Sequence, residues 1–149
     1  MTTQTANALD PTNPLHALPI VVGAHVRAEV EDRPTAAALR DAIATRIPAG
    51  FPFVPVVLTD LWYLNTDALR AQPTISIGRP DVNALSAFLA DKLPSVLAVD
   101  DRFVVLLDPE LTDPAACCWG IDARATAESV QAFAERWVDG FLRAAAPDR

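Results

Sequence analysis

One segment of the chain, residues 74–89, carries the pattern of a strand, a tight turn and a helix in direct succession. Its β-branched start ends at Gly78, a proline follows at position 80, and an apolar period of helical spacing begins at once. This order predicts a strand whose carboxyl end meets the amino terminus of a helix. A chain built from such units is expected to fold as an α/β domain.

The rest of the chain repeats the alternation of strands and helices. Strands are expected at 20–26, 56–59, 74–77, 96–99, 103–107 and 116–121, and helices at 34–47, 81–93 and 122–145. The first strand is expected to bend at Gly23 and to run on toward Glu29. The run 56–59 is apolar throughout, which is typical of an interior strand buried on both faces.

These elements predict one three-layer α/β domain with a mostly parallel or mixed sheet of five to six strands. Three main helices cover the sheet, and the pair Asp100-Asp101 is good turn chemistry for a β-hairpin. An α+β arrangement with all helices on one face is the alternative. Residues 1–18, rich in Thr, Asn and Pro, are expected to form a flexible arm, and residues 19–149 the domain.

Charge and composition exclude several classes of partner. A net charge of −7 argues against nucleic acid, because binding to a phosphate backbone needs a basic face. The first ten residues do not form a secretory signal, and no apolar run is long enough for a membrane span. The two cysteines, Cys117 and Cys118, are adjacent, so they would point to opposite faces of a strand as reduced thiols. We expect a soluble, cytoplasmic protein.

If the main strands are parallel, their carboxyl ends gather polar residues at one edge of the sheet. The candidate ligand-binding residues there are His25, Asp60, Gly78, Arg79 and Asn83. Open α/β sheets bind ligands in this crevice, and main-chain N–H groups at a helix start donate hydrogen bonds to small anions. The sequence thus offers a site for a phosphate or carboxylate, with Arg79 as its charge partner and Asn83 orienting it.

The same segment lacks the further glycines of a dinucleotide fingerprint and the Gly-Lys-Ser/Thr of a P-loop. It resembles the Ile-Gly-Gly-Pro…Val-Asn segments of some surface-layer and cell-wall-binding α/β modules, over about fifteen residues. Arg79 stands in the place of the second glycine, so no function is carried over from that resemblance.

A second hypothesis is an interaction or assembly protein without its own chemistry. The Pro-bounded loop with Phe51 and Phe53, together with Trp62 and Tyr63, would then form a contact surface. The N-terminal arm has no core of its own to offset the conformational entropy lost on ordering. Binding to a partner surface would supply that compensation. The expected partner is another protein, most simply a second copy in a homo-oligomer.

Catalytic and metal-binding constellations are weak in this sequence. His25 has no motif partner, the two cysteines have no basic neighbour, and Asp100-Asp101 fits a solvated turn. No His or Cys spacing predicts a metal site. A magnesium site with oxygen ligands from Asp60 and Asp122 is compatible with the sequence. No cofactor is predicted. We favour the assembly hypothesis, with anion binding or a hydrolase-like enzyme at Gly78–Asn83 as the alternative.

Overall fold

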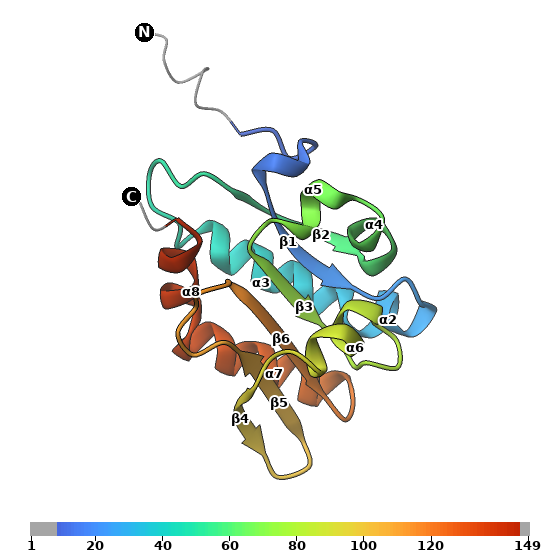
Figure 1. Cartoon of the computed structure of the whole chain (residues 1–149). Coiled ribbons are helices and arrows are strands. Elements are labelled where there is room, and N and C mark those ends of the chain that lie inside the picture. Colours follow the sequence, from blue (N-terminus) through green and yellow to red (C-terminus); the bar gives the residue numbers. More distant parts are fainter. Residues whose placement is uncertain (1–8, 147–149) are drawn as a thin grey trace, which may run out of the picture.

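The computed structural model describes residues 9–146, which form one six-stranded sheet with helices on both faces (Figure 1). The strands are β1 (Ala17–Val22), β2 (Val54–Thr59), β3 (Thr74–Ile77), β4 (Ser95–Val99), β5 (Phe103–Leu107) and β6 (Ala115–Gly120). The helices are the 3-10 turn η1 (Pro14–His16), α2 (Val26–Glu31), α3 (Arg33–Ala44), α4 (Asp60–Leu64), α5 (Asp67–Arg70), α6 (Ala84–Ala90), α7 (Ala123–Arg136) and α8 (Val138–Ala145).

The strand order is β2-β1-β3-β6-β5-β4. The first four strands in this order are parallel, and β5 and β4 extend the sheet in antiparallel fashion as a hairpin. This confirms the predicted α/β class and the mixed, mostly parallel sheet. The described residues contain seven α-helices rather than three main ones, because the helix expected over 122–145 is divided into α7 and α8 and the short helices α2, α4 and α5 accompany the main set.

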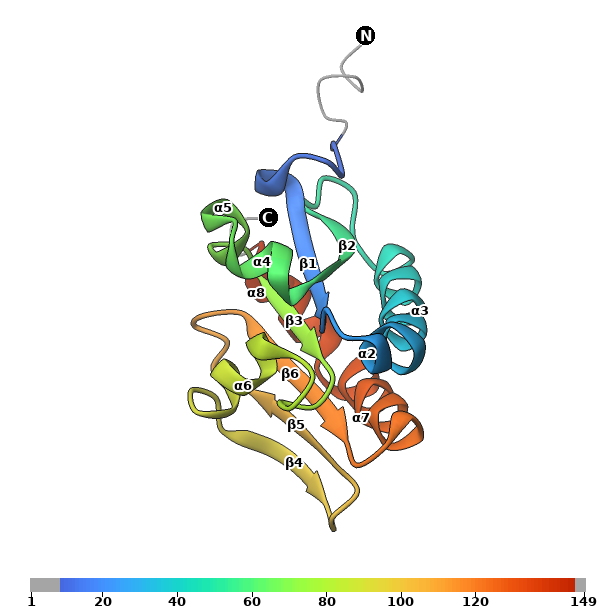
Figure 2. The ribbon, with the colours of Figure 1, turned by 90° about the vertical axis from the view of Figure 1, so that its right-hand side faces the viewer.

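Helices cover both faces of the sheet, so the structure has three layers. Figure 2 shows α3 and α7 on one side and α4, α5 and α6 on the other. One apolar cluster joins Leu18, Ile20 and Val22 of β1 to α3, α7 and α8. The other joins Ala17 and Val21 of the same strand to α4, α5 and α6. All six residues of β1 are buried, and this strand therefore anchors both layers.

The structure corrects three details of the sequence interpretation. The first strand begins at Ala17, inside the expected arm, and ends at Val22; residues from Val26 onward form α2 instead of continuing the strand. The helix expected over 122–145 is two helices that meet at Trp137. Residues 1–8 of the expected arm lie outside the described residues.

The third correction concerns β2, which is an edge strand and not an interior one. Its side chains are apolar on both faces because helices cover both: Val57 packs on the α3 layer, and Val56 and Leu58 on the α4 layer. Pro55 sits within the strand and has no N–H to donate, which suits a strand with one unpaired side.

Candidate functional site

The carboxyl ends of β1, β2, β3 and β6 meet at one edge of the sheet, and the structure brings Asp60, Gly78 and Asn83 together there. Asp60 is the central polar group of this edge and is buried. Its carboxylate accepts from the N–H of Ala24 at 2.9 Å and from the N–H of Ala84 at 2.7 Å. Asp60 therefore ties the loop after β1 to the start of α6.

Asn83 is 1 % exposed and uses all of its hydrogen-bonding capacity within the protein. Its side-chain amide donates to the carbonyls of Val21 at 3.2 Å and Ile77 at 2.9 Å. Its Oδ1 accepts from the N–H groups of Leu85 and Ser86 and so caps α6. The N–H groups that an anion would need at this helix start are thus already occupied by Asn83 and Asp60.

The crevice beyond the strands is filled by the chain itself. A Cβ added to Gly23 would lie 1.7 Å from the carbonyl oxygen of Val82, so the turn before α6 rests directly on the end of β1. Gly78 has φ +118°, and a Cβ there would lie 2.5 Å from Oδ2 of Asp32. Glycine is required at both positions by close approach, and little room for a ligand is left between them.

Arg79 turns away from this crevice. Its guanidinium donates to the carbonyl of Ile121 at 3.0 Å and pairs with the Asp81 carboxylate at 3.2 Å. It lines a surface cavity of about 390 Å³ near the hairpin turn, together with Asp100, Asp101 and Arg102. The carboxylates there offset the positive charge of the two arginines, which weakens the cavity as a binding site for an anion.

His25 is exposed and serves as the N-cap of α2. Its Nδ1 accepts from the N–H of Arg27 at 3.0 Å, so this ring nitrogen has a structural role. The two cysteines are buried on opposite faces of β6, as expected from their spacing. Burial raises the pKa of Cys117 to about 12 and also raises the pKa of Cys118, which keeps both thiols protonated near neutral pH.

Asp32 is the titratable residue of this edge that the sequence interpretation missed. It is 5 % exposed, and burial raises its pKa to about 6, with Glu31 and Asp81 adding to the rise and Arg79 opposing it. Asp32 precedes an Arg-Pro pair, which is a typical N-cap position. It makes no capping hydrogen bond, however, and its carboxylate lies against Gly78 instead.

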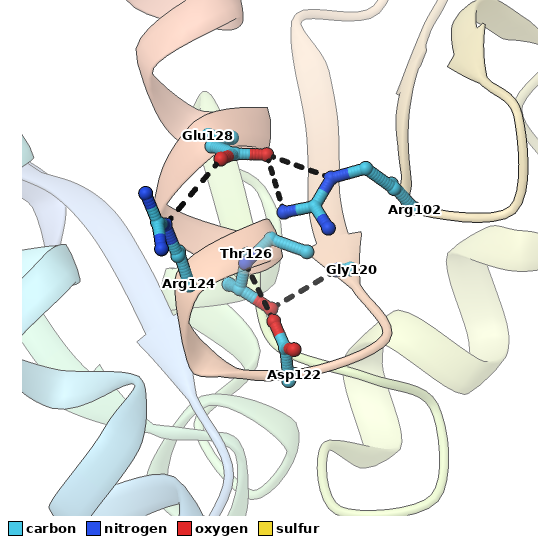
Figure 3. A network of polar contacts seen from close by, with 7 residues as sticks. Arg102, Gly120, Asp122, Arg124, Thr126 and Glu128 are labelled. Carbon is cyan, nitrogen blue, oxygen red and sulfur yellow. Dashed lines mark hydrogen bonds and ion pairs between the residues drawn. The ribbon is translucent and has the colours of Figure 1, made fainter.

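A second polar network fastens the hairpin to α7, as Figure 3 shows. Arg102 donates twice to Oε1 of Glu128, at 2.8 and 3.1 Å, and Arg124 lies 3.9 Å from the other oxygen. Asp122 caps α7 by accepting from the N–H of Ala125 at 2.8 Å. These contacts hold the ends of β5 and β6 against the helix and have a structural role.

The four residues expected at an interface divide into two groups. Phe51 is buried in the core, and Phe53 packs against it edge to face at 5.8 Å between ring centroids. Tyr63 is also buried. The Pro-bounded loop therefore faces inward, because its aromatic rings pack in the same core cluster as the buried face of α3. Trp62 alone of the four is strongly exposed, at 67 %.

Three other large apolar side chains are exposed on helices at this edge of the sheet. Leu61 is its neighbour on α4, and Val26 and Val30 stand one helical turn apart on α2. Both helices follow the carboxyl ends of neighbouring strands, and Asp60 at the start of α4 accepts from the N–H of Ala24 in the loop before α2. We call Val26, Val30, Leu61 and Trp62 the edge patch. Val26 was missed from the sequence because residues 20–26 were assigned to a strand, and Val30 was missed because no helix was expected before residue 34.

Comparison with known proteins gives no match to a protein-family model and none to a curated protein sequence. No helix within residues 9–146 has the length and apolar character needed to cross a membrane. The same residues contain no group of three or more His, Cys, Asp or Glu side chains arranged to hold a metal ion. The site must therefore be interpreted from its own geometry.

Proposed function

We propose that this protein is an interaction domain without a reaction of its own, and that it assembles with a second copy of itself through the edge patch. The observation that carries this proposal is the exposure of Val26, Val30, Leu61 and Trp62, at 63–74 %, on two helices that follow neighbouring strands at the same edge of the sheet. Exposed apolar clusters of this kind mark contact surfaces, and tryptophan is among the residues that contribute most to binding.

The charges on α2 favour a second copy as the occupant. Val26 and Val30 are followed by the exposed residues Arg27 and Glu31, also one turn apart. A two-fold axis through residue 28 would place Val26 opposite Val30 of the second copy, and an axis through residue 29 would place Arg27 opposite Glu31. An axis between these two positions, at the middle of α2, brings both pairs within one residue of direct opposition, so the helix surface is complementary to itself in charge.

The engagement of the chemically useful groups supports a non-catalytic role. Asp60 and Asn83 hold backbone groups, His25 caps a helix, and both thiols are buried with raised pKa values. A catalytic acid, base or nucleophile must reach a substrate, and these groups are committed to the fold.

Light scattering after size exclusion, at physiological ionic strength, tests the proposal. We expect the wild-type chain to have the mass of a dimer, and the variants Val30→Ser and Trp62→Ser to shift toward the monomer. Phe88→Ser is the matched control, because Phe88 is 55 % exposed on α6, outside the edge patch. A wild-type monomer at high concentration, or equal shifts in all three variants, would refute assembly through this surface.

A further inference from the structure

A cavity of about 610 Å³ lies between α4, α5 and α6, on the opposite side of α4 from Leu61 and Trp62 and separate from the crevice described above. This volume is within the ~300–1,000 Å³ range of small-molecule sites. Its inner wall is formed by Tyr63, Leu85 and Leu89, which are buried, and Phe88 stands exposed at its mouth. The cavity thus has a buried apolar floor and an exposed aromatic ring at its rim.

One end of the cavity carries a hydroxyl pair whose proton order is determined by the fold. Thr74 Oγ1 donates to the carbonyl oxygen of Gln72 at 2.8 Å, and a carbonyl can only accept. Tyr63 Oη lies 2.9 Å from Thr74 Oγ1, so the tyrosine must be the donor in that bond. The lone pairs of the Tyr63 oxygen are then left to accept a hydrogen bond.

The charges around this hydroxyl are mainly acidic. Arg70 and Asp67 form an ion pair on the rim of the cavity. Asp113 also lines the cavity, is exposed, and has no ion-pair partner within residues 9–146. Asp113 raises the pKa of Tyr63 in addition to burial, which agrees with a carboxylate near the phenol oxygen.

An acceptor oxygen, an unpaired carboxylate and an apolar wall together select a ligand with a cationic N–H donor and an apolar body. We propose that this cavity binds a small hydrophobic amine. The ammonium group is held by Asp113 and the Tyr63 oxygen, and the apolar body lies along Leu85 and Leu89 beneath Phe88. The net charge of −7 also attracts cations to the protein as a whole.

Amide NMR titration of the full chain tests this proposal with three probes: tryptamine, phenethylamine and octylamine. The matched anion is indole-3-propionate, which has the same ring as tryptamine and the opposite charge. We expect saturable shifts with the amines at Gln72, Leu89 and Asp113, and at least ten-fold weaker shifts with the anion. Absence of saturable binding by all three amines, or equal binding of the anion, overturns the proposal.

Two substitutions test the polar end. Asp113→Asn and Tyr63→Phe should each weaken amine binding about five-fold or more, because each removes one of the two groups that hold the ammonium. Asp41→Asn is the charge-matched control, since Asp41 is exposed on α3 in the other helix layer. An unchanged affinity in Asp113→Asn, or an equal loss in the control, shows that the carboxylate does not recognise the amine. Dimer mass is measured in parallel, because the two proposals stand on different surfaces.

Discussion

Replacing the Asp32 carboxylate by an amide should stabilise this protein at neutral pH. The carboxyl group is 5 % exposed, and its pKa in the folded state is raised to about 6 from an ordinary value of 3.8, chiefly by burial. A carboxyl whose pKa is raised by folding binds more protons in the folded than in the unfolded chain between these two values. The free energy of unfolding therefore falls as the pH rises from about 4 to about 6, and stays lower above that range.

The size of the effect follows from the shift. A difference of about two pKa units corresponds to about 3 kcal/mol at full ionisation, at roughly 1.4 kcal/mol per unit. Asp32→Asn keeps the shape beside Gly78 and removes the buried charge, but it also loses the attraction of Arg79. We expect a net gain of about 1–3 kcal/mol at pH 7.5 and no gain at pH 4.

Urea denaturation of the wild type and of Asp32→Asn at pH 4, 5, 6 and 7.5 measures this difference. Asp41→Asn, an exposed carboxylate on α3, serves as the control and should change stability by less than about 0.5 kcal/mol at any pH. A loss of stability in Asp32→Asn at pH 7.5 would show that the ionised carboxylate is stabilised by its surroundings, and a difference from wild type that is the same at pH 4 and 7.5 would show that folding does not raise the pKa of Asp32.

Four further substitutions test the packing of the sheet edge and core. Asp60→Asn should cost about 2–4 kcal/mol in urea unfolding, because one of the two N–H groups held by Asp60 then faces an amide N–H. Gly23→Ala should cost at least about 2 kcal/mol and raise local amide exchange, because its methyl group would overlap the carbonyl of Val82. Phe133→Ala should cost about 3–5 kcal/mol, and Trp137→Ala less, because Phe133 is fully buried and Trp137 is half-buried; equal costs would contradict the assignment.

The sequence was sufficient for the sheet and its class because those features depend on local patterns. β-branched runs, the proline two residues after Gly78 and the turn at Asp100-Asp101 each act over a few residues. The position of β2 in the sheet was missed because a parallel edge strand with helices on both faces is as apolar as an interior strand. Pro55 was the available signal, since a proline within a strand indicates an edge.

The location of the candidate site could be predicted from the sequence, but the hydrogen-bond partners of its polar groups could not. Parallel strands bring Asp60, Gly78 and Asn83 to one edge of the sheet, because each residue follows the carboxyl end of a strand. Whether their polar groups face a ligand or the backbone depends on contacts between residues 24 to 62 positions apart, such as those of Asp60 and Asn83. No local pattern encodes such contacts, and the same is true of Asp32, which is buried by the distant Gly78.

Self-association through α2 is the central claim of this account, and a charge exchange across that helix tests it most directly. Arg27→Glu and Glu31→Arg each place like charges opposite one another about the proposed two-fold axis, so each variant alone should have the mass of a monomer. In an equimolar mixture of the two variants every facing pair is again opposite in charge. Light scattering should then show a heterodimer, and the double variant should dimerise like the wild type. Single variants that keep the dimer mass, or a mixture that stays monomeric beside a dimeric wild type, would contradict pairing of α2 with itself.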